Sequence, residues 1–188
     1  MGSPLRHNAG NLPCTQATGQ GGGGRTGLTS ITIPNSETSI GNTIFYECES
    51  LESIEVDEAN TIYDSRDNCN AIIKTATNEL IAGCKNTTIP SSVTSIGYLA
   101  FYGCTSLKSI TIPSSVTKIS QQAFDACKDL EKVYFKHTTP PTFQSSCFKK
   151  QSGGVRTTYY FKKSTVANAF NTNYYDTSYG VKSTDYSW

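Results

Sequence analysis

Residues 107–119 read Leu-Lys-Ser-Ile-Thr-Ile-Pro-Ser-Ser-Val-Thr-Lys-Ile, and both halves of this text recur elsewhere in the chain. The first half returns at residues 28–34 as Leu-Thr-Ser-Ile-Thr-Ile-Pro, and the second at residues 91–96 as Ser-Ser-Val-Thr-Ser-Ile. Equivalent positions of neighbouring copies, such as Ile96 and Ile119, recur with a period of about 23 residues. Recurrence at a fixed period of about 20 to 50 residues indicates a solenoid, in which each unit packs on the next.

The period divides the chain from residue 28 to about residue 150 into five units. They begin at Leu28, Leu51, Cys84, Leu107 and Leu130. Cys84 therefore takes a leucine position, and we expect it to pack as a small hydrophobe. The unit that begins at Leu51 extends to Gly83 and is longer than the others by an insertion. Because no unit can cover its own apolar edge, we expect the units to stack in a single register, with like residues aligned.

Each unit contains three short patterns. Ile-x-Ile predicts a strand with both isoleucines inward and the residue between them outward, and the following proline ends the ladder. Ser-Ser-Val-Thr-x-Ile predicts a second short extended piece. Ala-Phe-x-x-Cys predicts a helical or 3₁₀ turn that directs Phe and Cys into the core.

The inserted residues of the second unit have a pattern of their own. Residues 71–75 and 80–83 are apolar segments joined by Ala-Thr-Asn-Glu, which predicts two strands and a four-residue turn. We expect a hairpin insertion at about residues 61–83 that projects from the stack. Asp64-Ser-Arg-Asp-Asn68 precedes it and is interpreted as a polar turn, because it lacks the ligand spacing of a calcium loop.

The two ends of the chain differ from the repeats. Residues 1–27 hold eight glycines, including the run at 21–24, and predict a disordered leader or a segment foreign to the natural protein. No apolar stretch of a secretory signal is present there. Residues 151–188 are rich in aromatics and are interpreted as a C-terminal cap, with a strand at 157–161 and a short helix at 164–170.

Composition excludes several functional classes. The formal net charge is only +1, which argues against nucleic-acid binding by bulk charge. No apolar run approaches the length that a membrane-spanning helix needs. Only His7 and His137 are available for histidine-based metal sites or triads, and His137 is expected in a surface loop beside two prolines. We therefore predict no catalytic residue, no metal site and no cofactor, and the chain is not expected to be an enzyme.

Three cysteines follow the register. Cys48, Cys104 and Cys127 each lie at the same distance from the start of their unit, so they should form a column along the stack. Stacked side chains are parallel, which opposes disulfide torsion. We expect free, buried thiols, and leave open whether Cys104 and Cys127 pair.

Charge is unevenly distributed. The stretch from Glu37 to Asp67 holds nine acids and one base, whereas the stretch from Lys132 to Lys163 holds seven bases and no acid. Such faces can serve solubility alone. Alternatively, the basic end meets an acidic partner or polysaccharide, or molecules associate head to tail.

The outward strand positions form the candidate binding surface. This outward column comprises Thr32, Glu55, Thr88, Thr111 and Tyr134. Short hydroxyl side chains also simply keep strands soluble, so the column has an alternative structural explanation. Tyr134 with Lys132 and Lys136 is the predicted contact patch, since aromatic and basic side chains anchor interfaces.

The strings LTSITIP (28–34), DNCNAIIKTATNELIAGCKNTTIPSSVTSIG (67–97), AFYGCTSL (100–107) and SLKSITIPSSVTKIS (106–120) resemble the BspA-like leucine-rich repeats, a bacterial cell-surface family. A unit of about 23 residues with Ile-x-Ile-Pro and Phe-x-x-Cys carries the fold of that family. The resemblance covers about residues 28–150. It implies a right-handed, β-rich α/β leucine-rich-repeat solenoid.

The resemblance also implies secretion or display on the cell surface and non-enzymatic adhesion to an extracellular or host protein or to a glycan. A second interpretation remains open. Glu37 stands where later units have Val93 and Val116, so the first unit is expected to be exposed. The chain would then be a structural or assembly module, a fragment of a larger surface protein whose first repeat stacks on another coil.

Overall fold

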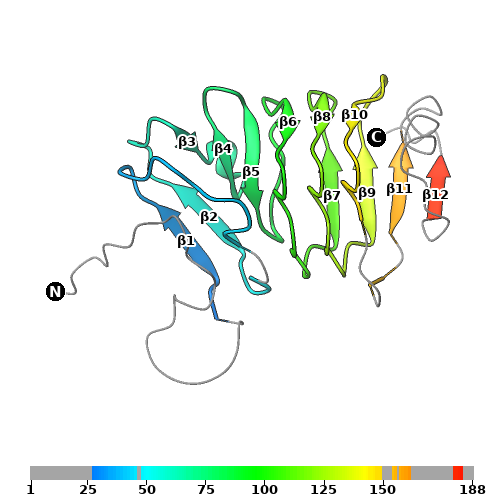
Figure 1. Cartoon of the computed structure of the whole chain (residues 1–188), viewed down its shortest axis with the longest axis horizontal. Helices are drawn as coiled ribbons and strands as arrows, with labels where there is room; N and C mark the ends of the chain where they lie inside the picture. The colour runs from blue at the N-terminus through cyan, green and yellow to red at the C-terminus, as the bar shows by residue number, and fades with distance from the viewer. Residues whose placement is uncertain (1–26, 46–47, 150–153, 156, 162–179, 184–188) are drawn as a thin grey trace.

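The computed structural model describes residues 27–45, 48–149, 154–155, 157–161 and 180–183. It shows a leucine-rich-repeat β-solenoid of about five turns with almost no helix (Figure 1). Among the described residues, the one 3₁₀ helix is η2 (Arg66–Asn68). No helix in this part of the chain is both long and apolar enough to cross a membrane. The predicted fold class is confirmed.

The first strands of the units pair in parallel and form two sheets. One sheet holds β1 (Ser30–Ile33) and β2 (Ser53–Val56). The other holds β7 (Ser109–Ile112), β9 (Lys132–Phe135), β11 (Thr158–Phe161) and β12 (Gly180–Ser183). Ser30 pairs with Ser53 and Ser109 pairs with Lys132, so the repeat period of the sequence is also the register of the ladder.

The second extended pieces form a separate sheet along the stack. Its two-residue strands β6 (Ser95–Ile96), β8 (Lys118–Ile119) and β10 (Thr142–Phe143) pair in parallel. It continues through β5 (Glu79–Gly83), β4 (Ala71–Lys74) and β3 (Tyr63–Asp64). The short second strand predicted for each complete unit is therefore confirmed from β6 onward.

The Phe-x-x-Cys segments form hydrogen-bonded turns rather than a 3₁₀ helix. The Cys104 N–H donates to the Phe101 carbonyl at 3.0 Å. The rings of Phe101 and Phe124 stack with centroids 4.7 Å apart, and those of Phe124 and Phe148 stack at 4.8 Å. Both predicted features, inward Phe and inward Cys, are confirmed by their burial.

The predicted hairpin exists, but its predicted projection from the stack is wrong. β4 and β5 pair in antiparallel fashion, and β5 also pairs in parallel with β6, so the hairpin is an internal part of the sheet. Ala71, Ile72 and Ile73 are all fully buried. Three consecutive apolar residues are typical of a strand covered on both faces, whereas a projecting hairpin would alternate with polar residues.

The β4–β5 hairpin separates two hydrophobic clusters. Ile72 and Ala82 belong to the N-terminal cluster, together with Ile33 of β1. Ile73 and Leu80 belong to the C-terminal cluster, which extends through the stacked phenylalanines. The expectation of one register through all five units is therefore wrong across the hairpin, because the inserted strands interrupt the ladder between the second and third units.

The cysteine predictions had mixed outcomes. Cys104 and Cys127 are free and buried, as predicted, and Cys84 is 1% exposed at its leucine position. Cys48 is instead disulfide-bonded, so its prediction as a free thiol is wrong. Parallel side chains disfavour a bond within the column, but that argument does not apply to a partner outside it.

The predictions for the two ends of the chain can be compared with the structure only in part. Residues 1–26 and the predicted helix at 164–170 lie outside the described residues. The strand predicted at 157–161 is confirmed as β11, which pairs with β9 in the same parallel sense as the repeat strands. The first-strand sheet therefore continues beyond residue 150.

Candidate binding face

The residues of the outward column lie on the solvent side, as the alternation of side chains along a strand predicts. Thr32, Glu55, Thr88 and Thr111 are exposed, and Tyr134 is half-buried. These positions are next to one another within each sheet. Thr32 pairs with Glu55, and Thr111 pairs with Tyr134, because every paired strand keeps the same phase of alternation.

The column is interrupted at Thr88, which does not lie in a strand. The Thr88 N–H donates to the Cys69 carbonyl at 3.0 Å. The Thr87 hydroxyl donates to the Asn70 carbonyl at 2.6 Å and accepts from the Cys84 N–H at 2.8 Å. The third unit is thus held against the start of the hairpin insertion.

On its other side, the third unit makes no ladder with β7. No backbone hydrogen bond joins residues 85–90 to β7, although both segments are fully described. At the next interface, the Lys132 N–H donates to the Lys108 carbonyl at 3.2 Å and the Lys136 N–H to the Ile112 carbonyl at 3.0 Å. The parallel ladder under the outward column is therefore interrupted between the third and fourth units.

An acidic groove of about 630 Å³ is lined by residues of the first two units. Thr32 and Glu55 line it together with Asp57, Glu58, Asp64 and Asp67. Burial disfavours the charge of Asp64, but hydrogen bonds from Arg66 and Thr75 outweigh that effect and lower the pKa of its carboxyl. Within the described part of the chain, no group of three or more His, Cys, Asp or Glu side chains is placed to hold a metal ion.

A second groove, of about 560 Å³, lies at the interruption between the third unit and β7. We call it the hydroxyl groove. It is lined by Thr87, Thr88, Ile89 and Ser91 from the third unit, by Ser109, Ile110, Thr111, Pro113 and Ser114 from the fourth, and by Lys136. Lys136 is the one charged residue in this lining and has no ion pair among the described residues.

Beyond the hydroxyl groove, two tyrosines stack on the outward face. The ring centroids of Tyr134 and Tyr160 are 4.7 Å apart, with 15° between the ring planes. Lys132 is exposed on the same strand as Tyr134. Sequence reasoning selected Tyr134 but missed Tyr160, because β11 follows β9 at a longer spacing than the repeat period, as the pairing of Lys132 with Thr158 shows.

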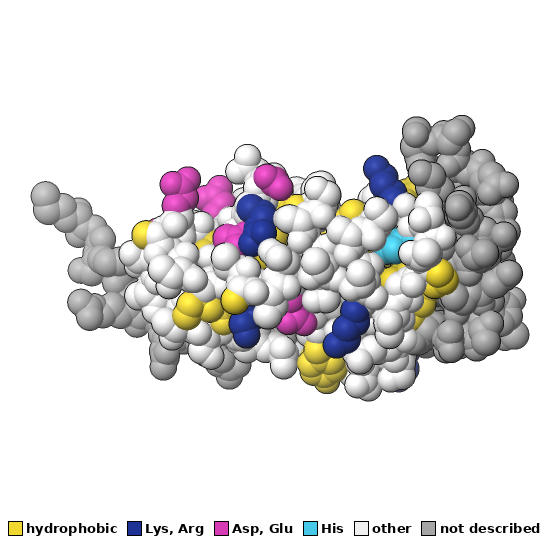
Figure 2. Space-filling model, turned by 90° about the horizontal axis from the view of Figure 1, so that it is seen from above, with side chains coloured by type: hydrophobic (Ala, Val, Ile, Leu, Met, Phe, Trp, Pro, Cys, Tyr) yellow, Lys and Arg dark blue, Asp and Glu magenta, His cyan; other side chains and the backbone are white. Residues whose placement is uncertain are grey.

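Charged side chains are also unevenly placed on the folded molecule. On the face seen in Figure 2, acidic side chains gather toward the end that carries β1, β2 and β3. The bases among the described residues of the opposite end include Lys132, Lys136 and Lys149. The polarity inferred from the sequence is therefore present in the described residues.

His137 is buried, so its prediction as a surface-loop residue is wrong. Its Nε2 lies 2.7 Å from the Val116 carbonyl of the preceding unit, and its ring centroid lies 5.9 Å from that of Phe135. Its Nδ1 is buried with no hydrogen-bond partner. Burial lowers the pKa of His137, and the bond to Val116 opposes this only in part.

The buried thiols are poor nucleophiles. Burial raises the pKa of Cys69 to about 11 and that of Cys104 and Cys147 to about 12. A cysteine nucleophile acts as the thiolate, which such pKa values exclude near neutral pH.

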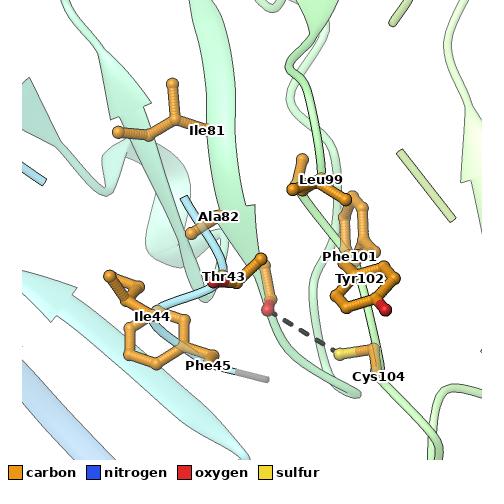
Figure 3. Close-up of a pocket in the computed structure, with 11 residues that line it drawn as sticks. Thr43, Ile44, Phe45, Ile81, Ala82, Leu99, Phe101, Tyr102 and Cys104 are labelled. Atoms are coloured by element: carbon orange, nitrogen blue, oxygen red, sulfur yellow. Dashed lines mark hydrogen bonds between the residues drawn. The ribbon is translucent and has the colours of Figure 1, made fainter. Parts of the chain in front are cut away.

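The small pocket beside Cys104 is also unsuited to chemistry. Residues 43–45, 81–83, 99–102 and Cys104 line it, and Cys104 contacts the Gly83 carbonyl there (Figure 3). Its volume is about 10 Å³, which is no more than a water molecule needs. We therefore place the candidate site on the outward face and not in this pocket.

Comparison with known families agrees with the repeat geometry. The profile described as "BspA type Leucine rich repeat region (6 copies)" matches residues 24–79 and 73–174. The chain belongs to the BspA-type leucine-rich repeat family. The Ile-x-Ile-Pro and Phe-x-x-Cys patterns of this BspA-type protein thus have the roles that the register predicted, in strand and turn respectively.

Solved structures are also similar to this chain, at low identity. A leucine-rich repeat protein from Eubacterium ventriosum is 24% identical (TM-score 0.43), with 73% of this chain and 43% of that chain covered. A leucine-rich cell surface protein from Faecalibacterium prausnitzii is also 24% identical (TM-score 0.48), with 84% and 48% covered. The pneumococcal vaccine antigen PcpA is 14% identical (TM-score 0.42), with 85% and 56% covered.

This chain thus spans about half the length of those structures. No curated protein gives a significant sequence match.

Proposed function

We propose that this BspA-type protein is a non-enzymatic, secreted or cell-surface protein that binds an extracellular protein or a glycan through its outward face. The binding surface that we favour is the contact patch of Tyr134, Tyr160, Lys132 and Lys136. Family membership supports the bacterial surface setting, and the disulfide at Cys48 is typical of an oxidising compartment.

The stacked tyrosines carry the proposal. Both belong to outward positions, since their strand neighbours Val133, Phe135, Tyr159 and Phe161 are buried. Two parallel rings offer a rigid apolar surface at a low entropic cost, with hydroxyls at its edge. The neighbouring lysines add positive charge, which favours acidic groups on the partner.

The non-enzymatic assignment has its own support. The thiols in the described core are held protonated, and buried His137 is bonded to a backbone carbonyl rather than to a nucleophile. Catalytic sites instead bring a base, a nucleophile and an accessible cavity together.

A binding screen against immobilised matrix proteins and glycans, run at low and at physiological salt, tests the proposal. For any ligand found, Tyr134→Ala should weaken binding at least about tenfold, as truncation of an interface anchor does. Tyr98→Ala is the matched control, because Tyr98 is 44% exposed on the turn after β6 and should change affinity little. Equal binding by both variants would contradict the patch.

The assembly alternative has a separate observation in its favour. Leu28, Ile31, Ile40 and Ile44 are only partly buried against the N-terminal cluster. β1 pairs only with β2 among the described strands. An apolar coil end of this kind could stack on another coil. Sedimentation at high concentration checks this idea, and a single sharp monomer boundary would count against it.

A further inference from the structure

We propose that the hydroxyl groove binds an extended peptide that carries an acidic side chain. The peptide backbone pairs with the free edge of β7, and its carboxylate meets Lys136. This inference rests on the proposed function and specifies a partner class for one part of the same outward face.

The edge of β7 that faces the third unit has backbone groups without a ladder partner. The Lys108 and Ile112 carbonyls accept hydrogen bonds from β9 and the residue that follows it. Because backbone groups alternate along a strand, those of Ser109 and Thr111 point the other way, toward the hydroxyl groove. No backbone hydrogen bond from residues 85–90 reaches them.

The opposite side of the groove is fixed in place and does not close the gap. Thr88 and Thr87 are bonded to the Cys69 and Asn70 carbonyls. Lys85 adds an ion pair to Glu52 at 2.8 Å. The third unit is therefore bonded on its hairpin side, and the backbone groups at the edge of β7 remain available to a bound peptide.

The geometry favours a peptide over a glycan. A strand edge presents N–H and C=O groups in an alternation that repeats about every 6.6 Å, and an extended backbone matches this spacing. Addition of a strand to an exposed edge is a common mode of peptide recognition.

The lining of the groove indicates the charge that the bound peptide should carry. It is otherwise built from hydroxyl and aliphatic side chains, and Lys136 is its one charged residue. A carboxylate on the peptide complements that single cation.

Amide hydrogen exchange tests the free edge without any ligand. Ser109 and Thr111 should exchange at least about tenfold faster than Lys132 and Tyr134, their equivalents in β9, whose amides face β7. Equal protection of the two pairs in the free protein would show that the edge is already satisfied, and the proposal would be overturned.

Peptide binding tests the occupant. A phage-displayed library of random dodecapeptides is selected on the intact chain, and the enriched peptides are synthesised and titrated. We expect enrichment of Asp or Glu and protection of the Ser109 and Thr111 amides on binding. Methylation of alternate peptide nitrogens should abolish binding, whereas methylation of the intervening nitrogens should be tolerated.

Two variants make the test specific. Lys136→Gln should weaken peptide binding about tenfold, which is the effect of losing one charge-assisted hydrogen bond. Lys118→Gln is the matched control, since Lys118 is exposed in β8 of the other sheet. An absence of enriched binders, equal affinity of the two variants, or tolerance of methylation at every nitrogen would each overturn the peptide proposal.

The outcome also separates this inference from the proposed function. Binding that is lost with Tyr134→Ala but leaves the Ser109 and Thr111 amides unprotected would preserve the contact patch and overturn the groove. Binding that is lost with Lys136→Gln but unchanged with Tyr134→Ala would support the groove and contradict the patch.

Discussion

Inward phenylalanines are the residues on which each turn of this solenoid depends. Phe124 is 2% exposed and stacks between Phe101 and Phe148. The Phe124→Ala variant should lose about 3 to 5 kcal/mol of unfolding free energy, because it removes both partners' ring contacts and leaves a cavity. Urea denaturation measures this loss. Tyr98→Ala is the control, and a loss below about 1 kcal/mol for Phe124→Ala would contradict the packing.

His137 should make the stability depend on pH. Its folded-state pKa lies below the ordinary value of 6.5, so the unfolded chain binds a proton at pH values where the folded chain does not. The neutral His137 therefore contributes its full stabilisation above pH 6.5. This contribution is lost as the pH falls from 6.5 through the lower pKa of the folded state. Denaturation curves from about pH 7.5 down to about 5 measure the slope, and His137→Gln should flatten it. An identical slope in the variant would refute the assignment.

At the residue scale, the sequence was informative wherever the register applied. It placed Phe101, Ile112, Thr111 and Cys104 on the observed sides, because the strand period and the repeat period agree. It failed at His137, where two prolines suggested a surface loop. The buried ring instead bonds to the Val116 carbonyl of the unit before it, much as the Asn60 amide donates to the Glu37 carbonyl at the equivalent position.

The β4–β5 hairpin is the element with the greatest influence on the architecture. Its strand side chains are divided between the two hydrophobic clusters, and β5 continues the sheet into β6. The sequence predicted both strands but not their location. An insertion is normally assigned to the surface, and only the unbroken run Ala71-Ile72-Ile73 indicated burial on both faces.

Ile72→Ser should distinguish an internal hairpin from a projecting one. It removes a fully buried side chain and leaves a hydroxyl in its place, so the expected cost is about 3 kcal/mol. Lys74→Ser, at the exposed end of the same strand, should cost less than about 0.5 kcal/mol. Comparable denaturation midpoints for the two variants would contradict the location of the hairpin.

At the scale of the whole molecule, the described residues form two packed blocks in series. The N-terminal cluster includes partly exposed Ile31, Ile40 and Ile44, whereas the C-terminal cluster is built from almost fully buried residues. Native-state hydrogen exchange should therefore give lower opening free energies for amides of β1 and β2 than for β9, by at least about 1 kcal/mol. One common opening free energy for all three strands would exclude the division.

The break in the outward column was beyond sequence reasoning. The third unit has the same Thr-x-Ile-Pro text as its neighbours, so its own residues predict a strand. At the interruption, the Thr88 N–H donates to the carbonyl of inserted Cys69 and the Thr87 hydroxyl donates to that of Asn70. These bonds join the third unit to the insertion, so they depend on the assembled chain and are not visible in a single repeat.

The division at the hairpin has a consequence for how such an array tolerates change. Ile72 and Ile73 face different blocks, so a substitution beside Ile33 and one beside Phe148 lie in separate hydrophobic clusters. Free-energy costs of such distant substitutions are additive. Mutations can therefore accumulate on one side without compensating changes on the other, and each block is free to diverge at its own evolutionary rate.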